Sequence, residues 1–202
     1  MPTATDTAKK DQRHAALIDL TIDLIAERGV EACTFRNLAT INGTTTRPFT
    51  YAFGNRANLL AAVARESWHR LGFAPGDAPE PGSDPLATLY ELCTRAVPAN
   101  GMGDPAMRAY AAVSLHSAEN PPLREELAAA NAQGVGAYLQ IVRAAQRAGQ
   151  IAAEIDPADL ISAIWALSDG LILAAVSDPD HFTGERIERI WKFGFDALVS
   201  AG

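Results

Sequence analysis

Apolar side chains recur every three to four residues along most of this 202-residue chain, which is the spacing of amphipathic helices. In the segment 13–28, Leu17, Ile18 and Ile22 fall on one side of such a helix. The segment ends at Arg28-Gly29, where a base in the last turn and a glycine beyond it favour helix termination. We therefore predict a first helix over 13–28 with one broad buried face.

The pattern continues through the rest of the chain and predicts an all-α fold of about nine helices. No stretch after residue 85 alternates apolar and polar side chains as a strand does. Prolines stand at the expected start of several helices, where their missing N–H is tolerated. The further helices are expected near residues 35–41, 45–53, 56–71, 86–98, 105–118, 122–148, 157–177 and 183–200.

The segment 73–85, FAPGDAPEPGSDP, differs in composition from everything around it. It holds four prolines, two glycines and three carboxylates. Such a composition is typical of a connector between domains.

Two short helices and the turn between them stand out near the N-terminus. Thr34 precedes the first as an N-cap, and Asn42-Gly43 turns the chain toward the second. This arrangement predicts a helix-turn-helix unit. The second helix opens with three threonines (44–46), whose small hydroxyls suit the first turn of a helix that enters a DNA major groove, and Arg47 is suited to guanine.

The dipeptide Arg47-Pro48 sets the expected start of this second helix. Proline is tolerated only in the first turn of a helix, and it disfavours helical backbone in the residue before it. We therefore expect regular helix to begin at about Pro48, with Arg47 on extended backbone that frees its guanidinium to reach a base.

The distribution of charge supports a nucleic-acid-binding N-terminal part, although the net charge of the chain is −7. Residues 1–72 hold nine Lys/Arg against seven Asp/Glu, whereas residues 73–202 hold eight against seventeen. Such an asymmetry is typical of a nucleic-acid module joined to a second domain.

Residues 18–63 carry a set of features in one register over 46 residues: an apolar helix ending in AERG, Thr34, LA at 38–39, Gly43, Phe53 and NRANLL. Together they resemble the N-terminal domain of the TetR (tetracycline repressor) family of transcriptional regulators. The segment SDGLILAAVSDP at 168–179 resembles the penultimate helix of that family. The recognition helix departs from the family pattern, which usually has Gly-Thr in place of Arg47-Pro48 and Tyr and His in place of Thr50 and Ala52.

The resemblance implies a three-helix helix-turn-helix DNA-binding domain over 1–55 and a larger helical domain for ligand binding and dimerisation over 56–202. It implies a cytoplasmic, homodimeric regulator, with repression as the expected action. Its partners would be a palindromic operator in double-stranded DNA and an unidentified small-molecule effector. No cofactor, metal or membrane partner is expected.

The residues expected to contact DNA lie in the two short helices and at the start of the next. Arg56 stands where the family usually has a lysine close to a phosphate. Tyr51 is open between a phosphate contact and the core, whereas Phe49 and Phe53 are expected in the core. The expected contacts are Thr34, Arg36, Thr44, Thr45, Thr46, Arg47, Thr50, Tyr51 and Arg56.

Two further sets of candidates lie mainly after the first 60 residues. Aromatic, thioether and histidine side chains suit an apolar small-molecule site: Trp68, Phe73, Met102, Met107, Tyr110, His116, Tyr138 and Trp165. The last two helices carry apolar faces that the family pairs across a two-fold axis, and Gly170 would allow close helix approach. The expected interface comprises Leu160, Ile164, Trp165, Leu171, Ile172, Ile187, Ile190, Trp191 and Phe195.

Two other functions compete with a DNA-binding regulator. A helical binding protein that has lost DNA reading is one, because the recognition helix lacks the usual Tyr and His. A helical-bundle enzyme is the other, since ESWH at 66–69 has Glu-x-x-His spacing, but the second copy that a di-iron site needs is missing. Cys33 and Cys93 match no metal or redox spacing and are expected to be buried, reduced thiols. The longest apolar run, 171–176, is too short to cross a membrane.

Overall fold

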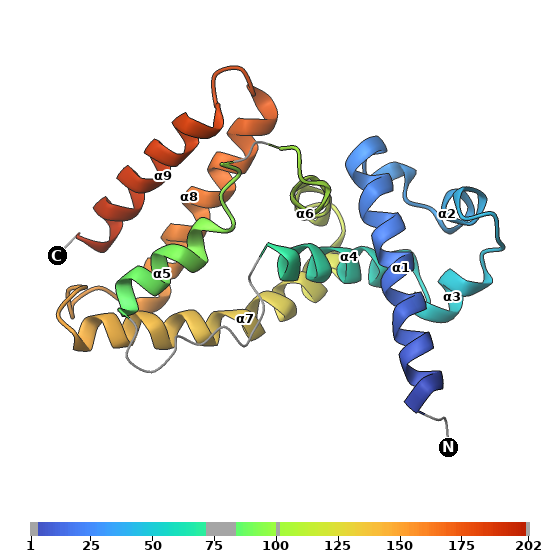
Figure 1. The fold of residues 1–202 in the computed structure, drawn as a ribbon, viewed down its shortest axis with the longest axis horizontal. Coiled ribbons are helices and arrows are strands. Elements are labelled where there is room, and N and C mark those ends of the chain that lie inside the picture. Colours follow the sequence, from blue (N-terminus) through green and yellow to red (C-terminus); the bar gives the residue numbers. More distant parts are fainter. Residues whose placement is uncertain (1–3, 72–83, 100–101, 201–202) are drawn as a thin grey trace. The chain divides into compact units, whose positions relative to one another are not determined.

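The computed structural model describes residues 4–71, 84–99 and 102–200. Within these ranges the chain forms nine α-helices, one short 3₁₀ helix and no strand, which confirms the all-α fold class (Figure 1). The elements are α1 (Ala4–Arg28), η1 (Val30–Ala32), α2 (Phe35–Ile41), α3 (Arg47–Phe53), α4 (Arg56–Arg70), α5 (Pro85–Thr94), α6 (Pro105–Ser117), α7 (Pro121–Arg147), α8 (Pro157–Ser177) and α9 (Gly184–Val199). All but the last two residues of the connector 73–85 lie outside the described residues.

The chain divides into two compact units, neither of which is continuous in sequence. Unit 1 comprises residues 1–68 and 105–128, and unit 2 comprises residues 69–104 and 129–202. The boundaries fall inside α4 and α7, because α6 and the start of α7 pack with the N-terminal helices. The functional division into 1–55 and 56–202 stays a prediction.

Unit 1 is built around the apolar face of α1. In Figure 1, α1 lies between α6 on one side and the α2–α3 pair on the other. Ile22 of α1, Leu38 of α2, Phe49 of α3 and Leu59 of α4 are completely buried in a shared core. The expected burial of the α3 phenylalanines is thus confirmed, with Phe53 also in this core.

α1 begins at Ala4, nine residues before the start that the apolar pattern predicted. The added segment, ATDTAKKDQ, has no apolar periodicity, so a hydrophobic pattern cannot detect it. It contains alanine, lysine and glutamine, which are good helix formers. A helix whose later turns are anchored in a core can extend at little cost, because nucleation has already occurred.

α5 ends at Thr94, four residues before the predicted end. Pro98 disfavours helical backbone in the residue before it. The chain instead turns, with the Ala96 and Val97 amides donating to the carbonyls of Cys93 and Thr94. Ala96 and Val97 still reach the core of unit 2, since both are buried.

Unit 2 is held together by packing of α8 on α9 and by hydrogen bonds that join α5 to both. Trp191 Nε1–H of α9 donates to Thr94 Oγ1 at 2.8 Å, and the Thr94 hydroxyl donates to the Tyr90 carbonyl at 2.7 Å. Ser168 of α8 donates to the carbonyl of Ala96, after α5, at 3.2 Å. Buried side chains of α9 thus find both apolar contacts and polar partners within one chain.

The close approach of α9 to its neighbours depends on glycines other than Gly170. A Cβ at Gly194 would overlap the Leu167 side chain of α8, whereas a Cβ at Gly170 would meet nothing within 4 Å. The expectation for Gly170 concerns helices that pair between two copies, and it stays a prediction.

α8 is the one helix of the described residues that is long and apolar enough to cross a membrane, judged by length and composition alone. The apolar run 171–176 did not reveal this property, because a run of uninterrupted apolar residues is shorter than the apolar helix that contains it. In the structure, α8 supplies the core of unit 2: Leu160, Ile161, Ile164, Leu171 and Ile172 are buried.

Cys33 and Cys93 are free thiols, and both are buried, as the sequence predicted. Burial raises the pKa of the Cys33 thiol to about 11, although the positive charge of Arg56 acts in the opposite direction. Burial raises the pKa of the Cys93 thiol to about 12. Both thiols are therefore protonated and unreactive near neutral pH.

Gly184, the first residue of α9, provides a test of packing in unit 2. A Cβ at this position would overlap the backbone carbonyl oxygen of Ala99, which cannot move as a flexible side chain can. We expect Gly184→Ala to lower the free energy of unfolding by about 1–3 kcal/mol. Gly136→Ala is the matched control: a Cβ there meets nothing, so the better helix former should add up to about 1 kcal/mol. Chemical denaturation measures both, and equal effects of the two substitutions would contradict the packing described for α9.

Candidate nucleic-acid interface

The α2–α3 pair forms the helix-turn-helix unit that the sequence predicted. Thr34 caps α2, its Oγ1 accepting the Asn37 amide at 3.2 Å. Gly43 adopts a φ of 60°, a left-handed conformation that favours glycine, and the Thr44 amide then donates to the Ala39 carbonyl at 2.9 Å. These bonds fix the turn from which α3 departs.

α3 begins at Arg47, so the expectation that this residue lies on extended backbone is wrong. Thr46 occupies the N-cap position in a near-helical conformation, and Pro48 is the second helical residue. The first turn thus tolerates Pro48 because its missing N–H would have had no helical partner. Arg47 is nevertheless exposed, so it remains accessible at the protein surface although it belongs to the helix.

The two faces of α3 are clearly distinct. Phe49 and Phe53 are buried, whereas Tyr51 is 82% exposed, which settles its open assignment against the core. Thr50 is exposed and bonds back to the Thr46 carbonyl at 3.2 Å. The Thr46 side chain makes no capping bond, although Thr46 occupies the N-cap position of α3.

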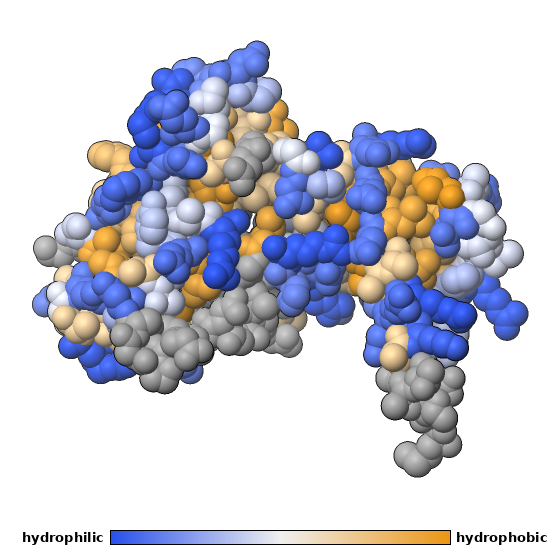
Figure 2. Space-filling model, viewed as in Figure 1, coloured by the Kyte–Doolittle hydropathy of each residue, from blue (hydrophilic) through white to orange (hydrophobic). Residues whose placement is uncertain are grey.

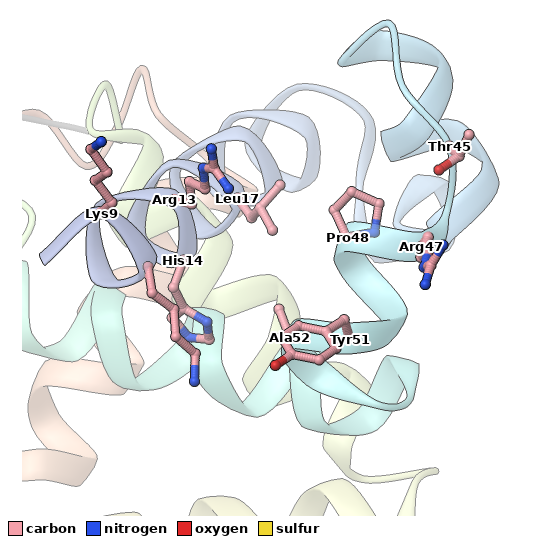
Figure 3. Close-up of a pocket in the computed structure, with 10 residues that line it drawn as sticks. Lys9, Arg13, His14, Leu17, Thr45, Arg47, Pro48, Tyr51 and Ala52 are labelled. Atoms are coloured by element: carbon pink, nitrogen blue, oxygen red, sulfur yellow. The ribbon is translucent and has the colours of Figure 1, made fainter. Parts of the chain in front are cut away.

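A groove of about 900 Å³ separates the N-terminal half of α1 from α3. Figure 3 shows Lys9, Arg13 and His14 on the α1 side and Arg47 and Tyr51 on the α3 side. The described residues that line it are Lys9, Lys10, Arg13, His14, Leu17, Thr45, Arg47, Pro48, Tyr51 and Ala52. Among these residues there are four permanent cations and no carboxylate.

The α1 side of this groove was missed by the sequence reasoning. Figure 2 shows that the part of α1 next to the grey N-terminal atoms is strongly hydrophilic. Lys9, Lys10 and Arg13 are exposed there. The ring of His14, one turn after Lys10, lies 4.7 Å from the ring of Phe53. Their spacing of three and four residues is itself a helical signal, which a search for apolar positions does not register.

The remaining expected DNA contacts differ in their surroundings. Arg36 is exposed on α2, and Thr44 and Thr45 are exposed before α3. Arg56 is different, because its guanidinium donates to the backbone carbonyls of Val30 (2.7 Å) and Cys33 (2.8 Å). The guanidinium is therefore directed at the protein, and the phosphate contact expected of Arg56 stays a prediction.

The eight candidate ligand residues do not form one cluster in either unit. In unit 1, the Trp68 and Tyr110 rings lie 5.5 Å apart, Met107 is buried, and His116 contacts Glu31 and Arg56. In unit 2, the Tyr138 and Trp165 rings meet edge to face at 5.9 Å, and Met102 is half-buried. Phe73 lies outside the described residues.

Most of the residues expected at a dimer interface are buried within the single chain. They are Leu160, Ile164, Leu171, Ile172, Ile187, Trp191 and Phe195, while Ile190 and Trp165 are half-buried. The correction has a physical reason: an apolar helical pattern shows that a face is covered, but not by which chain. The outer faces of α8 and α9 expose other apolar side chains, with Leu173 52%, Val176 53% and Phe193 76% exposed.

No group of three or more His, Cys, Asp or Glu side chains that could hold a metal ion occurs in the described part of the chain. Glu66 and His69 of the ESWH segment are therefore not part of such a group.

Comparison with known proteins agrees with this geometry. Residues 85–200 match the model of the C-terminal domain of BetI-type transcriptional repressors. No curated protein matches the sequence.

Three solved structures illustrate the similarity of fold. A TetR-family regulator from Rhodococcus sp. has a TM-score of 0.73 at 18% identity, covering 94% of this chain and 100% of that one. A transcriptional regulator from Saccharomonospora viridis in complex with choline has a TM-score of 0.71 at 18% identity, covering 93% and 96%. The transcriptional regulator FadR from Bacillus subtilis, in complex with stearoyl-CoA, has a TM-score of 0.71 at 17% identity, covering 92% and 97%.

Proposed function

The chain belongs to the TetR-family transcriptional regulators, with a C-terminal domain of the BetI repressor type, and from this membership we propose how it binds DNA. Two copies insert α3 into successive major grooves of a roughly palindromic operator, and a small molecule bound by the C-terminal domain releases them. The action is repression, and the location is the cytoplasm. The residues 1–55 read DNA, and 56–202 bind the effector and the second copy.

The observation that carries this proposal is the basic groove between α1 and α3. One of its four cations, Arg47, begins α3, in the turn where side chains of a recognition helix meet base edges, and the other three lie on α1. A polyanion that follows the groove would meet Lys9, Lys10 and Arg13, and the described lining residues include no carboxylate to repel it. DNA is such a polyanion, and its phosphates supply the salt-dependent part of binding.

The exposed groups divide naturally between phosphate and base contacts. Lys9, Lys10 and Arg13 of α1 and Arg36 of α2 are assigned to phosphates. Thr34, the N-cap of α2, and the exposed Tyr51 of α3 are assigned to the DNA backbone as well, while Thr44, Thr45, Thr46 and Thr50 lie close to Arg47 in the sequence. Arg47, at the start of α3, is assigned to guanine, because its planar guanidinium can bond the O6 and N7 edge in two places.

This division predicts opposite responses from two variants. Arg47→Ala should cost about 1–3 kcal/mol on the operator and relax the preference at one base pair in each half-site. The double variant Lys9→Gln/Arg13→Gln should weaken binding to all sequences and reduce the salt slope by roughly two for each bound subunit. Selection of duplexes from a random pool, then titration at several salt concentrations, measures both.

The control for these titrations is Arg143→Gln, an exposed cation of α7 in unit 2, which should change neither quantity. Equal losses for Arg47→Ala on operator and random DNA would refute base reading by Arg47. Wild-type protein that enriches no sequence would support the alternative of a helical binding protein without DNA reading.

The second copy is proposed to cover Leu173, Val176 and Phe193. Phe193 is 76% exposed on α9, which is unusual for so large an apolar side chain, and α8 and α9 pack together in unit 2. Pairing of two copies also multiplies the affinity of a single short recognition helix.

Phe193→Glu tests this surface. A buried carboxylate without a partner opposes association strongly, so the variant is expected to sediment as a monomer and to lose operator affinity. Leu115→Glu is the matched control, since Leu115 is 63% exposed on α6 of unit 1 and its variant should stay dimeric. A dimeric Phe193→Glu protein would show that another surface joins the copies.

The effector site is proposed to include Tyr138 and Trp165, the aromatic pair of α7 and α8. Choline, which is bound in the similar structure from Saccharomonospora viridis, is the first ligand to test, because aromatic rings attract quaternary ammonium ions. The ligand acts only if it binds the non-DNA conformation more tightly. α4 and α7 each contribute residues to both units and are proposed to carry the change.

Choline at saturation is expected to weaken operator binding by about 5–150-fold, the usual range of such coupling. Trp165→Leu should weaken the choline response by about tenfold, and fluorescence-polarisation titration of labelled operator measures both. Release of the operator by stearoyl-CoA, with no response to choline, would instead assign an acyl chain to the site.

A further inference from the structure

Arg56 is the first residue of α4, and its guanidinium is occupied by the protein. Nε–H donates to the Cys33 carbonyl at 2.8 Å, and Nη2–H donates to the Val30 carbonyl at 2.7 Å. Nη1 lies 3.4 Å from His116 Nε2, and Nη2 lies 3.7 Å from a Glu31 carboxylate oxygen. Three elements besides α4 thus meet at one side chain: the η1 turn, the entrance of α2, and α6.

The start of α4 is an unfavourable place for a cation, since the N-terminus of a helix carries partial positive charge. The bonds to two carbonyls and the nearby Glu31 carboxylate offset this disadvantage. The arrangement is therefore stabilising only because the guanidinium reaches the segment 30–33.

That segment determines how α2 begins. The Val30 carbonyl also accepts the Cys33 amide at 2.9 Å, which closes the η1 turn. The next residue is Thr34, whose Oγ1 caps α2 through the Asn37 amide at 3.2 Å. By holding the carbonyls on both sides of the turn, Arg56 fixes the orientation from which Thr34 starts α2.

His116 connects the same site to α6. Its Nδ1 lies 3.5 Å from a Glu31 carboxylate oxygen, and its Nε2 faces Arg56, so the ring bridges the two charged partners. His116 lies near the end of α6, a helix that also packs along α1. A displacement of α6 would therefore move a contact of the group that holds the entrance of α2.

We infer that Arg56 is a positioning residue for operator binding, which holds the entrance of α2 and connects it through His116 to α6, rather than a phosphate contact. The inference rests on the proposed DNA-binding function. The two roles of Arg56 can be distinguished experimentally. A phosphate contact requires only positive charge, whereas the positioning role requires the forked geometry of a guanidinium.

The test compares Arg56→Lys and Arg56→Gln in operator titrations at several salt concentrations. A lysine keeps the charge but cannot bond both carbonyls as arginine does, so both variants should bind about tenfold to a hundredfold more weakly, the scale of one or two lost hydrogen bonds from a charged group. Their salt slopes should equal that of the wild type. Rescue by lysine, together with a slope lowered by about one for each subunit in the glutamine variant, would show a phosphate contact and overturn the inference.

Arg36 supplies the matched control, since it is an exposed cation on α2. Arg36→Gln is expected to lower the salt slope, and Arg36→Lys to restore it. Opposite behaviour at positions 36 and 56 in the same assay would separate charge from geometry.

Hydrogen exchange gives a second readout that needs no DNA. Arg56→Lys should speed exchange of the amides in 33–41 while leaving those of α8 and α9 unchanged. His116→Ala should do the same more weakly, with a smaller loss of operator affinity and an unchanged salt slope. Unchanged exchange at 33–41 in both variants would overturn the positioning role. If the wild type bound no DNA sequence selectively, the proposed function would fail, whereas the exchange result would still decide the role of Arg56.

Discussion

A helix of seven residues does not hold its shape in water, so the position of α3 depends on burying two phenylalanines against the rest of unit 1. Phe49 is completely buried, and Phe53 is nearly so, with the His14 ring of α1 against it. Burial of these two side chains fixes the rotation of α3 about its own axis, and so it fixes the direction of every other side chain on the helix. Arg47, Thr50 and Tyr51 must therefore point outward, which gives α3 its exposed polar face.

The same packing explains the groove beside α3. α1 is anchored by Ile22 and Ile25 in the core, and its first turns continue beyond that core as a polar helix. The cations at 9, 10 and 13 are thereby held on a rigid element facing α3 rather than on a flexible tail. Rigid presentation matters for binding, because ordering a long charged side chain or a free segment costs entropy.

Arg56 shows how one residue type can serve two purposes at the same place in a fold. A cation at the start of α4 can reach either a phosphate or the protein, and the choice depends on what lies within reach. Here two backbone carbonyls with suitable geometry lie at hydrogen-bond distance. The carbonyls are presented by η1, a single 3₁₀ turn that the apolar pattern does not reveal.

The sequence by itself determined the helical class, the helix-turn-helix pair and most helix boundaries, because apolar spacing, capping residues and glycine turns are local properties. It also indicated that apolar faces of α8 and α9 are covered, although it assigned them to a dimer interface. Only the tertiary structure decided what buries them: Ile187, Trp191 and Phe195 face the core of their own unit, leaving Leu173, Val176 and Phe193 exposed. It likewise decided that Lys9 and Arg13 face α3 and that Arg56 faces carbonyls. These outcomes depend on contacts between residues distant in sequence, which local spacing does not encode.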